Sequence, residues 1–355
     1  MEKKKIVFLY SELAAYFLAC VEKLAAEPNL EVHIVRWEVN NEAPFHFSFS
    51  GDIKIYNRKD YTSDEQLQQL ISGINPAVIY SSGWMDRGYL QVCKAWKKKI
   101  PVIVGFDNQW KGSLKQYIAT FISPFKILNH FTHCWVPGDL QYEYAVRLGF
   151  KKENILTGFY SCDFDFFYHQ YLQNTVHKKA NFPKRFIYVG RYTEHKGIRD
   201  LWQAFIELQE VPEQKNNPDK WELWCLGTGD VKPVEHPQIR HFGFVQPGDM
   251  APFIKDTGVF VLPSHFEPWG VVVHEFAAAG FPVICSDQTG ARTAFVQNDF
   301  NGYIYRSGAV PELKAALLRM MNAGNEKLAG MAENSIAKAK KITPDTWVKQ
   351  LVSLL

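Results

Sequence analysis

The chain has 355 residues, of which 46% are hydrophobic and 22% charged, and its formal net charge is +3. This length and composition are typical of a protein with about two globular domains, and the small net charge argues against nucleic acid as a main partner. The six cysteines include no Cys-x-x-Cys pair, so a disulfide framework and a clustered zinc site are disfavoured and a cytoplasmic protein with reduced thiols is expected.

The N-terminal segment MEKKKIVFLYSELAAYFLACVEKLA combines lysines with apolar residues, as signal peptides do. Glu12 interrupts the apolar run, and Glu22 and Lys23 follow at helical spacing. We therefore expect a strand over 6–10 and an amphipathic helix from about Glu12, capped by Ser11; a cleaved signal is the alternative. No apolar run reaches the roughly 18 residues that a membrane-spanning helix needs.

Short apolar segments alternate with helical segments along the whole chain, a pattern that predicts parallel sheets covered by helices. In the first half, the candidate strands are 6–10, 32–37, 53–56, 77–82, 101–106 and 133–138. In the second half, they are 185–190, 221–227, 239–243, 259–264 and 282–287. The fold class is therefore α/β, with one Rossmann-type repeat in each half.

The regular pattern breaks between the halves. Residues 168–184 lack a clear period and end in Asn-Phe-Pro, which indicates a linker. The predicted first domain is 1–167 and the second is 185–342. A helix over 343–355 is expected to begin at Thr343 and Pro344.

The segment SHFEPWGVVVHEFAAAG (264–280) places Glu267 before a Pro-Trp-Gly turn and Glu275 inside the helix that follows. This helix begins near Gly270, directly after a predicted strand. A helix N-terminus carries unpaired N–H groups and partial positive charge, so it can bind a phosphate. Spacing alone leaves open that both glutamates are merely solvent-exposed.

A second motif, YVGRYTEHKGIRDL (188–201), delivers Gly190, Arg191 and Lys196 after another strand. Two cations in one loop with a glycine that permits close backbone approach suit a diphosphate, although each cation alone is more typical of a solvated surface. The turn at Gly227 and Gly229 in WCLGTGD is a weak signal alone.

Together with Gly243-Phe244-Val245, these motifs resemble the donor half of retaining GT-B glycosyltransferases, in particular glycosyltransferase family 4, formerly glycosyl transferases group 1. The resemblance covers residues 186–292. It implies two Rossmann-like domains that face a central cleft, with a nucleotide sugar on the second domain and the acceptor on the first. It also implies that the C-terminal helix packs back on the N-terminal domain.

The resemblance implies a role for each motif residue. Arg191 and Lys196 would hold the diphosphate, Glu267 would contact the donor sugar, and Glu275 would bind the ribose hydroxyls. Backbone groups would complete the donor site, at Gly190, Gly227, Gly229, Val245, Gly270 and Val271.

The first domain departs from the family pattern. The usual glycine pair after the first strand is replaced by YSELAAY, and the usual histidine is missing from the loop VGFDNQWKG. Asp107 stands there with Asn108 and Trp110, and we expect this group to orient the acceptor hydroxyl or the donor sugar. An Asx-turn is the equally weighted alternative for Asp107. Trp84, Asp86 and Arg87, which also follow a strand, are second-line acceptor candidates, and a solvated loop is the favoured alternative for them.

The expected function is a retaining, metal-independent transfer of a hexosyl or N-acetylhexosaminyl group in cell-envelope glycan assembly. Glu267, Asp107, Arg191 and Lys196 are the candidate catalytic residues. The donor would be UDP- or GDP-linked, and no cofactor or metal is expected, since the sole Asp-x-Asp pair (163–165) lies away from the donor motifs. The alternatives are a GT-B sugar-nucleotide epimerase and a non-catalytic nucleotide-sugar-binding subunit.

Positive charge is concentrated between Lys94 and Lys126, where seven lysines accompany one acidic residue. Aromatic and aliphatic residues alternate with these lysines, as they do on surfaces that contact anionic membranes. A peripheral location at the inner face of the cell membrane, with a lipid-linked glycan as acceptor, is therefore one hypothesis. The alternative is that the aromatics are core residues and the lysines only solvate helix faces.

Overall fold

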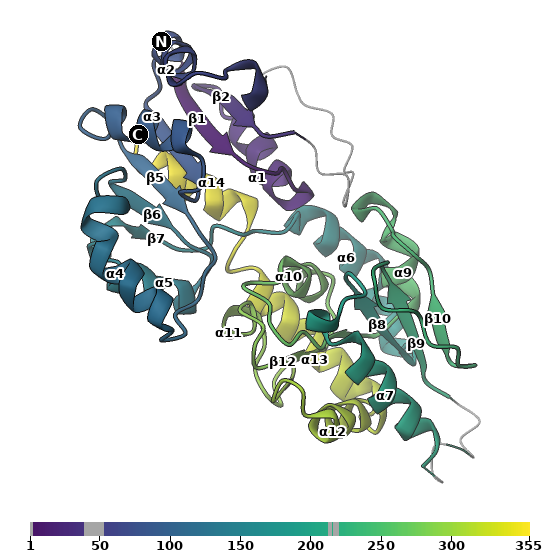
Figure 1. Cartoon of the computed structure of the whole chain (residues 1–355). Helices are drawn as coiled ribbons and strands as arrows, with labels where there is room; N and C mark the ends of the chain where they lie inside the picture. The colour runs from purple at the N-terminus through teal and green to yellow at the C-terminus, as the bar shows by residue number, and fades with distance from the viewer. Residues whose placement is uncertain (1–2, 39–52, 212–214, 216–219) are drawn as a thin grey trace. The chain divides into compact units, whose positions relative to one another are not determined.

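The computed structural model describes residues 3–38, 53–211, 215 and 220–355. The chain forms two compact units (Figure 1): residues 1–163 together with 342–355, and residues 164–341. Each unit is a parallel sheet covered by helices, which confirms the predicted α/β class with one Rossmann-type repeat in each half.

The first unit contains a seven-stranded parallel sheet in the order β3-β2-β1-β4-β5-β6-β7. The strands are β1 (Lys4–Tyr10), β2 (Leu30–Arg36), β3 (Ile53–Asn57), β4 (Val78–Ser82), β5 (Val102–Gly105), β6 (His133–Trp135) and β7 (Ile155–Leu156). The helices are α1 (Ala15–Ala25), α2 (Asp64–Ile74), α3 (Arg87–Trp96), α4 (Leu114–Lys126), α5 (Asp139–Arg147) and α14 (Pro344–Val352). The central strands are buried on both faces, which is why their sequences read as continuous apolar runs.

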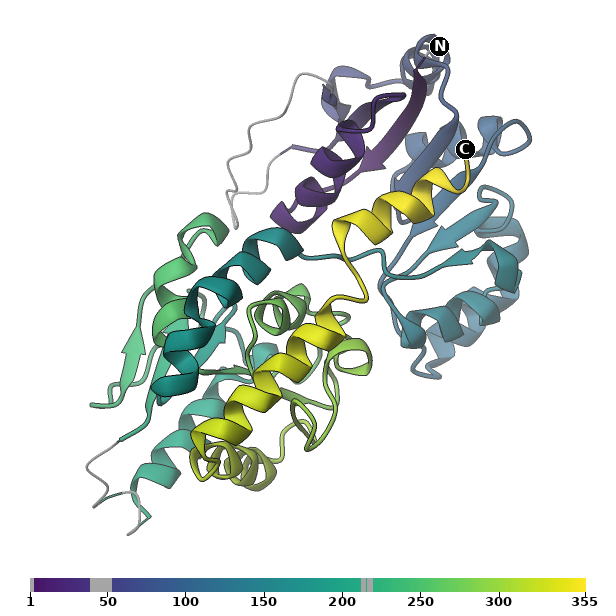
Figure 2. The ribbon, with the colours of Figure 1, turned by 180° about the vertical axis from the view of Figure 1, so that it is seen from behind.

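The helix α14 completes the core of the first unit, although it follows the second unit in sequence. It lies beside α1 (Figure 2), and its Trp347 stacks on Phe8 with ring centroids 5.9 Å apart. The Trp347 indole N–H donates to the carbonyl of Phe159 over 2.9 Å. Thr343 caps this helix, with its hydroxyl accepting from the amide of Thr346.

The second unit contains a six-stranded parallel sheet in the order β10-β9-β8-β11-β12-β13. Its strands are β8 (Arg185–Val189), β9 (Glu222–Leu226), β10 (Ile239–His241), β11 (Val259–Leu262), β12 (Val283–Ser286) and β13 (Gly302–Tyr305). Its helices are α6 (Phe164–Ala180), α7 (Ile198–Gln209), α9 (Ala251–Asp256), α10 (Val271–Ala278), α11 (Arg292–Phe295), α12 (Val310–Met321) and α13 (Asn325–Ala339).

A partly buried lysine joins two helices of this unit. The Lys178 ammonium group, on α6, donates to the carbonyls of Ile254 (2.6 Å) and Thr257 (2.8 Å) at the end of α9. It also lies 4.0 Å from the centre of the Phe281 ring. Burial lowers the pKa of Lys178 to about 7, and the nearby Asp256 carboxylate opposes this change.

Three local features differ from the sequence-based expectations. Ser11 does not cap α1, because the helix begins only at Ala15; the Ser11 amide instead donates to the Ser82 hydroxyl over 2.9 Å. Residues 164–180, which include much of the expected linker 168–184, form helix α6. This helix packs against α9, α10 and α13, so its apolar residues do not follow a single stripe. The short strands β7 and β13 were not expected.

Within the described part of the chain, no helix is both long and apolar enough to cross a bilayer.

Candidate functional site

Both sheets place their strand-order reversal beside the first strand of the unit, between β1 and β4 and between β8 and β11. Open parallel sheets bind ligands at this point, beyond the carboxyl ends of the strands. Each unit therefore offers one candidate region.

In the second unit, an ion pair joins the loops that follow β8 and β11. The Lys196 ammonium group, in a short 3₁₀ turn (Glu194–Lys196), contacts the carboxylate of Glu267. The two side chains are only 18% and 14% exposed. The structure thus brings together two residues that the sequence analysis selected from motifs 71 positions apart.

Further contacts fix the geometry of these two loops. The His265 imidazole lies 2.8 Å from the Asp200 carboxylate, and the His265 amide donates to the carbonyl of His195 over 2.8 Å. Gly197 has a φ of 66°, and a Cβ atom there would lie 2.0 Å from the carbonyl oxygen of Pro263. Only glycine can therefore occupy this position without moving the loop that carries Glu267.

Charges of both signs lie near His195 in the loop after β8. The pKa of His195 is lowered by partial burial and by the neighbouring charges of Lys196 and Arg191, while Glu267 opposes the shift. Arg191 is exposed, whereas Lys196 is mostly covered. An anion that approaches this surface therefore meets an accessible guanidinium first.

The glycines after β8 and β9 allow two loops to pack closely. The Gly190 amide donates to the carbonyl of Leu226, and the Tyr192 amide donates to that of Thr228. A Cβ atom at Gly227 would lie 1.9 Å from the Gly190 oxygen, and one at Gly229 would lie 2.3 Å from the Tyr192 oxygen. These glycines are thus required by backbone-to-backbone contact, which is a structural reason for the Gly-Thr-Gly turn.

The turn before α10 is fixed by hydrogen bonds and packing contacts with the segment that follows β12. The Glu267 amide donates to the carbonyl of Gln288, and the Gly290 amide donates to that of Glu267. Trp269 is buried against Phe295. Gly270 has a φ of 92° and precedes the first residue of α10, so the helix N-terminus begins directly beside Glu267.

The second unit also contains the other donor-side candidates. Val271 is the first residue of α10, and Glu275, partly buried, is one turn further along the helix. Val245 lies partly buried in the segment after β10. Their roles toward a ligand remain predictions.

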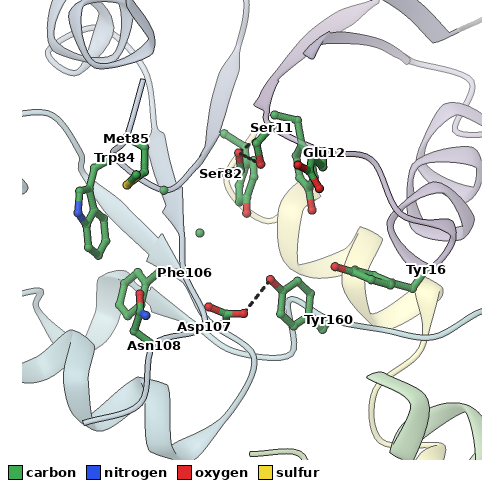
Figure 3. A pocket seen from close by; sticks show the side chains of 14 residues that line it. Ser11, Glu12, Tyr16, Ser82, Trp84, Met85, Phe106, Asp107, Asn108 and Tyr160 are labelled. Carbon is green, nitrogen blue, oxygen red and sulfur yellow. Dashed lines mark hydrogen bonds between the residues drawn. The ribbon is translucent and has the colours of Figure 1, made fainter. Parts of the chain in front are cut away.

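In the first unit, the loops after β1, β4 and β5 enclose a cavity of about 320 Å³ (Figure 3). Asp107, Asn108 and Trp84 line this cavity, as do Glu12 and Tyr16. The Tyr160 hydroxyl points at the Asp107 carboxylate, with the oxygens 3.5 Å apart.

The walls of this cavity are rich in neutral hydroxyl groups and carboxylates. Burial raises the pKa of Tyr10, Tyr80 and Tyr160 well above the usual value, and the charges of Tyr16 and Asp107 add to this rise. Neutral hydroxyls can both donate and accept, and carboxylates accept. Such walls suit a hydroxyl-rich ligand better than an anionic one.

Two candidates of the first unit lie elsewhere. The Trp110 ring is not among the cavity walls; it packs on Tyr144 and under the Arg147 guanidinium, 4.5 Å from the ring centre. Asp86 caps α3 and forms an ion pair with Arg58 over 3.1 Å.

Glu12, Tyr16 and Tyr160 were missed as site residues. Glu12 occupies the loop where the family's glycine pair is absent, which was the available signal.

Comparisons with known proteins agree with the geometry of the second unit. Residues 183–323 match the family model described as glycosyl transferases group 1. A glycosyltransferase of Methanocaldococcus jannaschii is 31% identical over 34% of this chain and 31% of its own length. The lipopolysaccharide 1,6-galactosyltransferase of Salmonella typhimurium is 22% identical over 61% of this chain and 62% of its own. The chain thus spans less than two thirds of the length of these relatives.

The likeness to solved structures extends over almost the whole chain. HepE of Anabaena, solved with UDP and glucose, superposes with a TM-score of 0.67 over 99% of this chain and 98% of its own, at 14% identity. A glycosyltransferase of Rickettsia africae superposes with a TM-score of 0.72 over 99% and 98%, at 11% identity. Residues 183–323 therefore match the group 1 glycosyl transferases, and the two Rossmann-like units of the chain have the GT-B fold.

Proposed function

We propose that the protein is a retaining glycosyltransferase that moves a sugar from a nucleoside diphosphate sugar to an acceptor hydroxyl. The observation that carries this proposal is the ion pair between Lys196 and Glu267, which joins the two switch-point loops beside the N-terminus of α10. Such a donor has a diphosphate, which cations can bind, and sugar hydroxyls, which a carboxylate can bind. The helix N-terminus at the same edge can stabilise the negative charge that develops on the diphosphate.

In this proposal each group has a separate task. Arg191 and Lys196 hold the diphosphate, the backbone from Gly270 to Val271 supports it from the helix N-terminus, and Glu267 accepts hydrogen bonds from the sugar. Glu275 binds the ribose hydroxyls. The segment at Val245 and the Gly190, Gly227 and Gly229 loops border the base.

Transfer requires one bond to break and one to form at the anomeric carbon. The bond to the diphosphate oxygen breaks, and its electron pair stays on the diphosphate. The acceptor oxygen bonds to the same face of the sugar and loses its proton to the departing diphosphate. Preorganised cations and N–H groups stabilise the charge that develops on the leaving group, and loss of one such donor typically costs on the order of 100-fold or more in rate.

The acceptor, in this proposal, enters the cavity of the first unit. Its carboxylates and neutral tyrosine hydroxyls suit a sugar, with Asp107 positioned to accept a hydrogen bond from a hydroxyl. Asn108 and Trp84 border the same space. Trp110, which packs on α5, supports the loop from behind instead of contacting the acceptor.

We further propose that the reaction needs no divalent metal, since the cationic loops already neutralise the diphosphate. Removing metal ions with EDTA should leave the rate unchanged, and a strict Mg²⁺ or Mn²⁺ requirement would contradict this. The names of two relatives in lipopolysaccharide synthesis support a role in cell-envelope glycan assembly. We propose in addition that this assembly takes place at the cytoplasmic side, with a glycan or lipid-linked glycan as acceptor.

Incubation with a panel of UDP-, GDP-, ADP- and dTDP-sugars tests the reaction class. Slow release of nucleoside diphosphate, accelerated by an acceptor, supports transfer. Conversion of the donor into another sugar nucleotide without release identifies an epimerase. Binding without any conversion identifies a non-catalytic subunit. A true donor at 100-fold saturation should add about 2.7 kcal/mol to the free energy of unfolding.

A further inference from the structure

Helix α4 of the first unit is amphipathic, but its apolar side faces solvent instead of the core. Its apolar side chains recur at helical spacing and form one stripe, and all of them are exposed; they are Leu114, Tyr117, Ile118, Phe121, Ile122 and Phe125. Phe121 is 84% exposed and Phe125 is 76% exposed. A helix of a globular protein normally turns such a stripe toward the core.

The inward side of α4 is small and polar. Ser123 is buried, while Gln116, Ala119 and Thr120 are partly covered. The Gln116 side chain donates to the carbonyl of Gln109 over 2.6 Å and accepts from the amide of Lys111 over 2.7 Å. These hydrogen bonds orient the helix so that its apolar stripe faces outward.

Several lysines accompany the stripe on α4 and at the end of α3. Lys115 and Lys126 lie on α4 itself, and Lys94, Lys98 and Lys99 lie at or just beyond the end of α3. All five are exposed. The Lys97 ammonium group donates to the carbonyl of Leu128, and the His130 imidazole lies 3.1 Å from the carbonyl oxygen of Lys126, so the end of α3 meets the turn that follows α4. The lysines at 97–99 and the C-terminus of α4 thus belong to one basic surface.

We propose that this face of the first unit docks on an anionic lipid bilayer, with the α4 stripe in the headgroup layer and the lysines against lipid phosphates. An exposed aromatic and aliphatic stripe bordered by like charges has the composition of interfacial helices. Charge decides between the candidate occupants. A second copy of the chain on the same face would bring identical lysines together, which disfavours a two-fold contact. The inference rests on the first unit alone and does not require the proposed transfer reaction.

Cosedimentation with vesicles tests the docking. We expect the full chain to sediment with vesicles of phosphatidylglycerol and phosphatidylcholine at low salt, and to remain in the supernatant with phosphatidylcholine alone. High salt should weaken the binding, because screening shortens the reach of the lysine charges. Recovery of the protein in the supernatant with anionic vesicles at low salt would overturn the proposal.

Two pairs of variants identify the surface. The double change Phe121→Ser and Phe125→Ser should lower the partition coefficient by about tenfold or more, since two exposed rings lose their apolar contact with lipid. The matched control is Val176→Ser on α6, a position that is 79% exposed in the second unit, and it should bind as the parent does. Lys94→Gln and Lys126→Gln should each weaken binding about fivefold. Lys327→Gln on α13, which is also exposed, serves as the charge control.

Two further readouts keep the result interpretable. All the substituted side chains are exposed, so the melting temperature of each variant should match that of the parent. Nucleotide binding should also be unchanged in the α4 variants, which separates failure of docking from failure of the donor site. If sedimentation velocity shows a dimer that the Phe121 and Phe125 changes dissociate, while vesicles are not bound, the face is an interface between copies and the membrane proposal is wrong.

Discussion

The ion pair between Lys196 and Glu267 predicts an unusual double-mutant cycle. Both side chains are mostly covered, so Lys196→Ala leaves a carboxylate without its cation, at a cost of about 3 kcal/mol or more in the free energy of unfolding. The same change weakens diphosphate binding in two ways. It removes the charged donor of Lys196, and it leaves the Glu267 carboxylate to repel the ligand. Each effect is worth about 2 kcal/mol, so the Kd for the nucleoside diphosphate should rise roughly 1,000-fold.

Removing both charges should be milder than removing the lysine alone. In the double variant Lys196→Ala with Glu267→Gln the repulsion is absent, so the Kd should rise only about 30-fold. Glu267→Gln alone should bind UDP or GDP at least as tightly as the parent, because these nucleotides lack the sugar that Glu267 contacts. It should nevertheless transfer sugar more slowly, because the sugar loses its hydrogen bond to the carboxylate. Calorimetric titration with UDP and GDP, together with initial transfer rates, measures both quantities.

The chain offers a matched control in the pair between Lys314 and Glu207, which is 3.1 Å long and much more exposed. Equivalent changes there should show a coupling of about 0–1 kcal/mol and leave nucleotide binding unaffected. If the Lys196 variant binds nucleotide as well as the parent, or the double variant binds worse than Lys196→Ala, the assignment of this pair to the diphosphate is refuted.

Three further predictions concern other parts of the molecule. Arg191→Ala should lower kcat/KM by about 100-fold or more, whereas Arg199→Ala, an exposed arginine paired with Glu194 in the same segment, should leave initial rates unchanged. Asp107→Asn should slow transfer on the order of 100-fold without changing nucleotide affinity, which calorimetry can verify, and Tyr160→Phe should have a smaller effect because its hydrogen bond is 3.5 Å long. For Lys178, the folded-state pKa of about 7 lies below the unfolded value, so the unfolded chain binds more protons between pH 7 and 10 and stability rises with pH there. Relative to Lys178→Met, the parent's free energy of unfolding should increase by about 1.4 kcal/mol per pH unit in urea titrations above pH 7; a flat difference would show that the buried amine stays charged.

Much of the fold was predictable because central parallel strands are buried on both faces. The segments around Phe8, Ile79 and Val261 are apolar without interruption, and each is a strand. The missed strand β7 has only two residues, and β13 begins at a glycine and reads GYIY, so neither gives a long apolar run. Helix α6 was not predicted because it contacts three other helices. Its apolar residues therefore occupy several sides of the helix, and the sequence shows no helical period.

The candidate sites were predictable to unequal degrees. In the second unit, Arg191, Lys196 and Glu267 stand in motifs with recognisable spacing. In the first unit, the cavity walls come from four segments distant in sequence, and the family's usual residues are absent. Tyr160 therefore carried no local signal, and Glu12 was marked only by the missing glycine pair; the folded sheet brings their segments together. The outward stripe of α4 was equally hidden, because a sequence period shows that a helix has an apolar side but not which way that side faces.

The return of α14 to the first unit bears on the order in which a nascent chain can acquire structure. Trp347 fills the core beneath Phe8, yet it is synthesised after the entire second unit. At a translation rate of about 5–20 residues per second, α14 is synthesised on the order of ten seconds or more after the last strand of the N-terminal sheet. Residues 164–341 can meanwhile complete their own core. The part of the protein that leaves the ribosome first is thus the last to be finished, and during that interval its apolar face is available to chaperones.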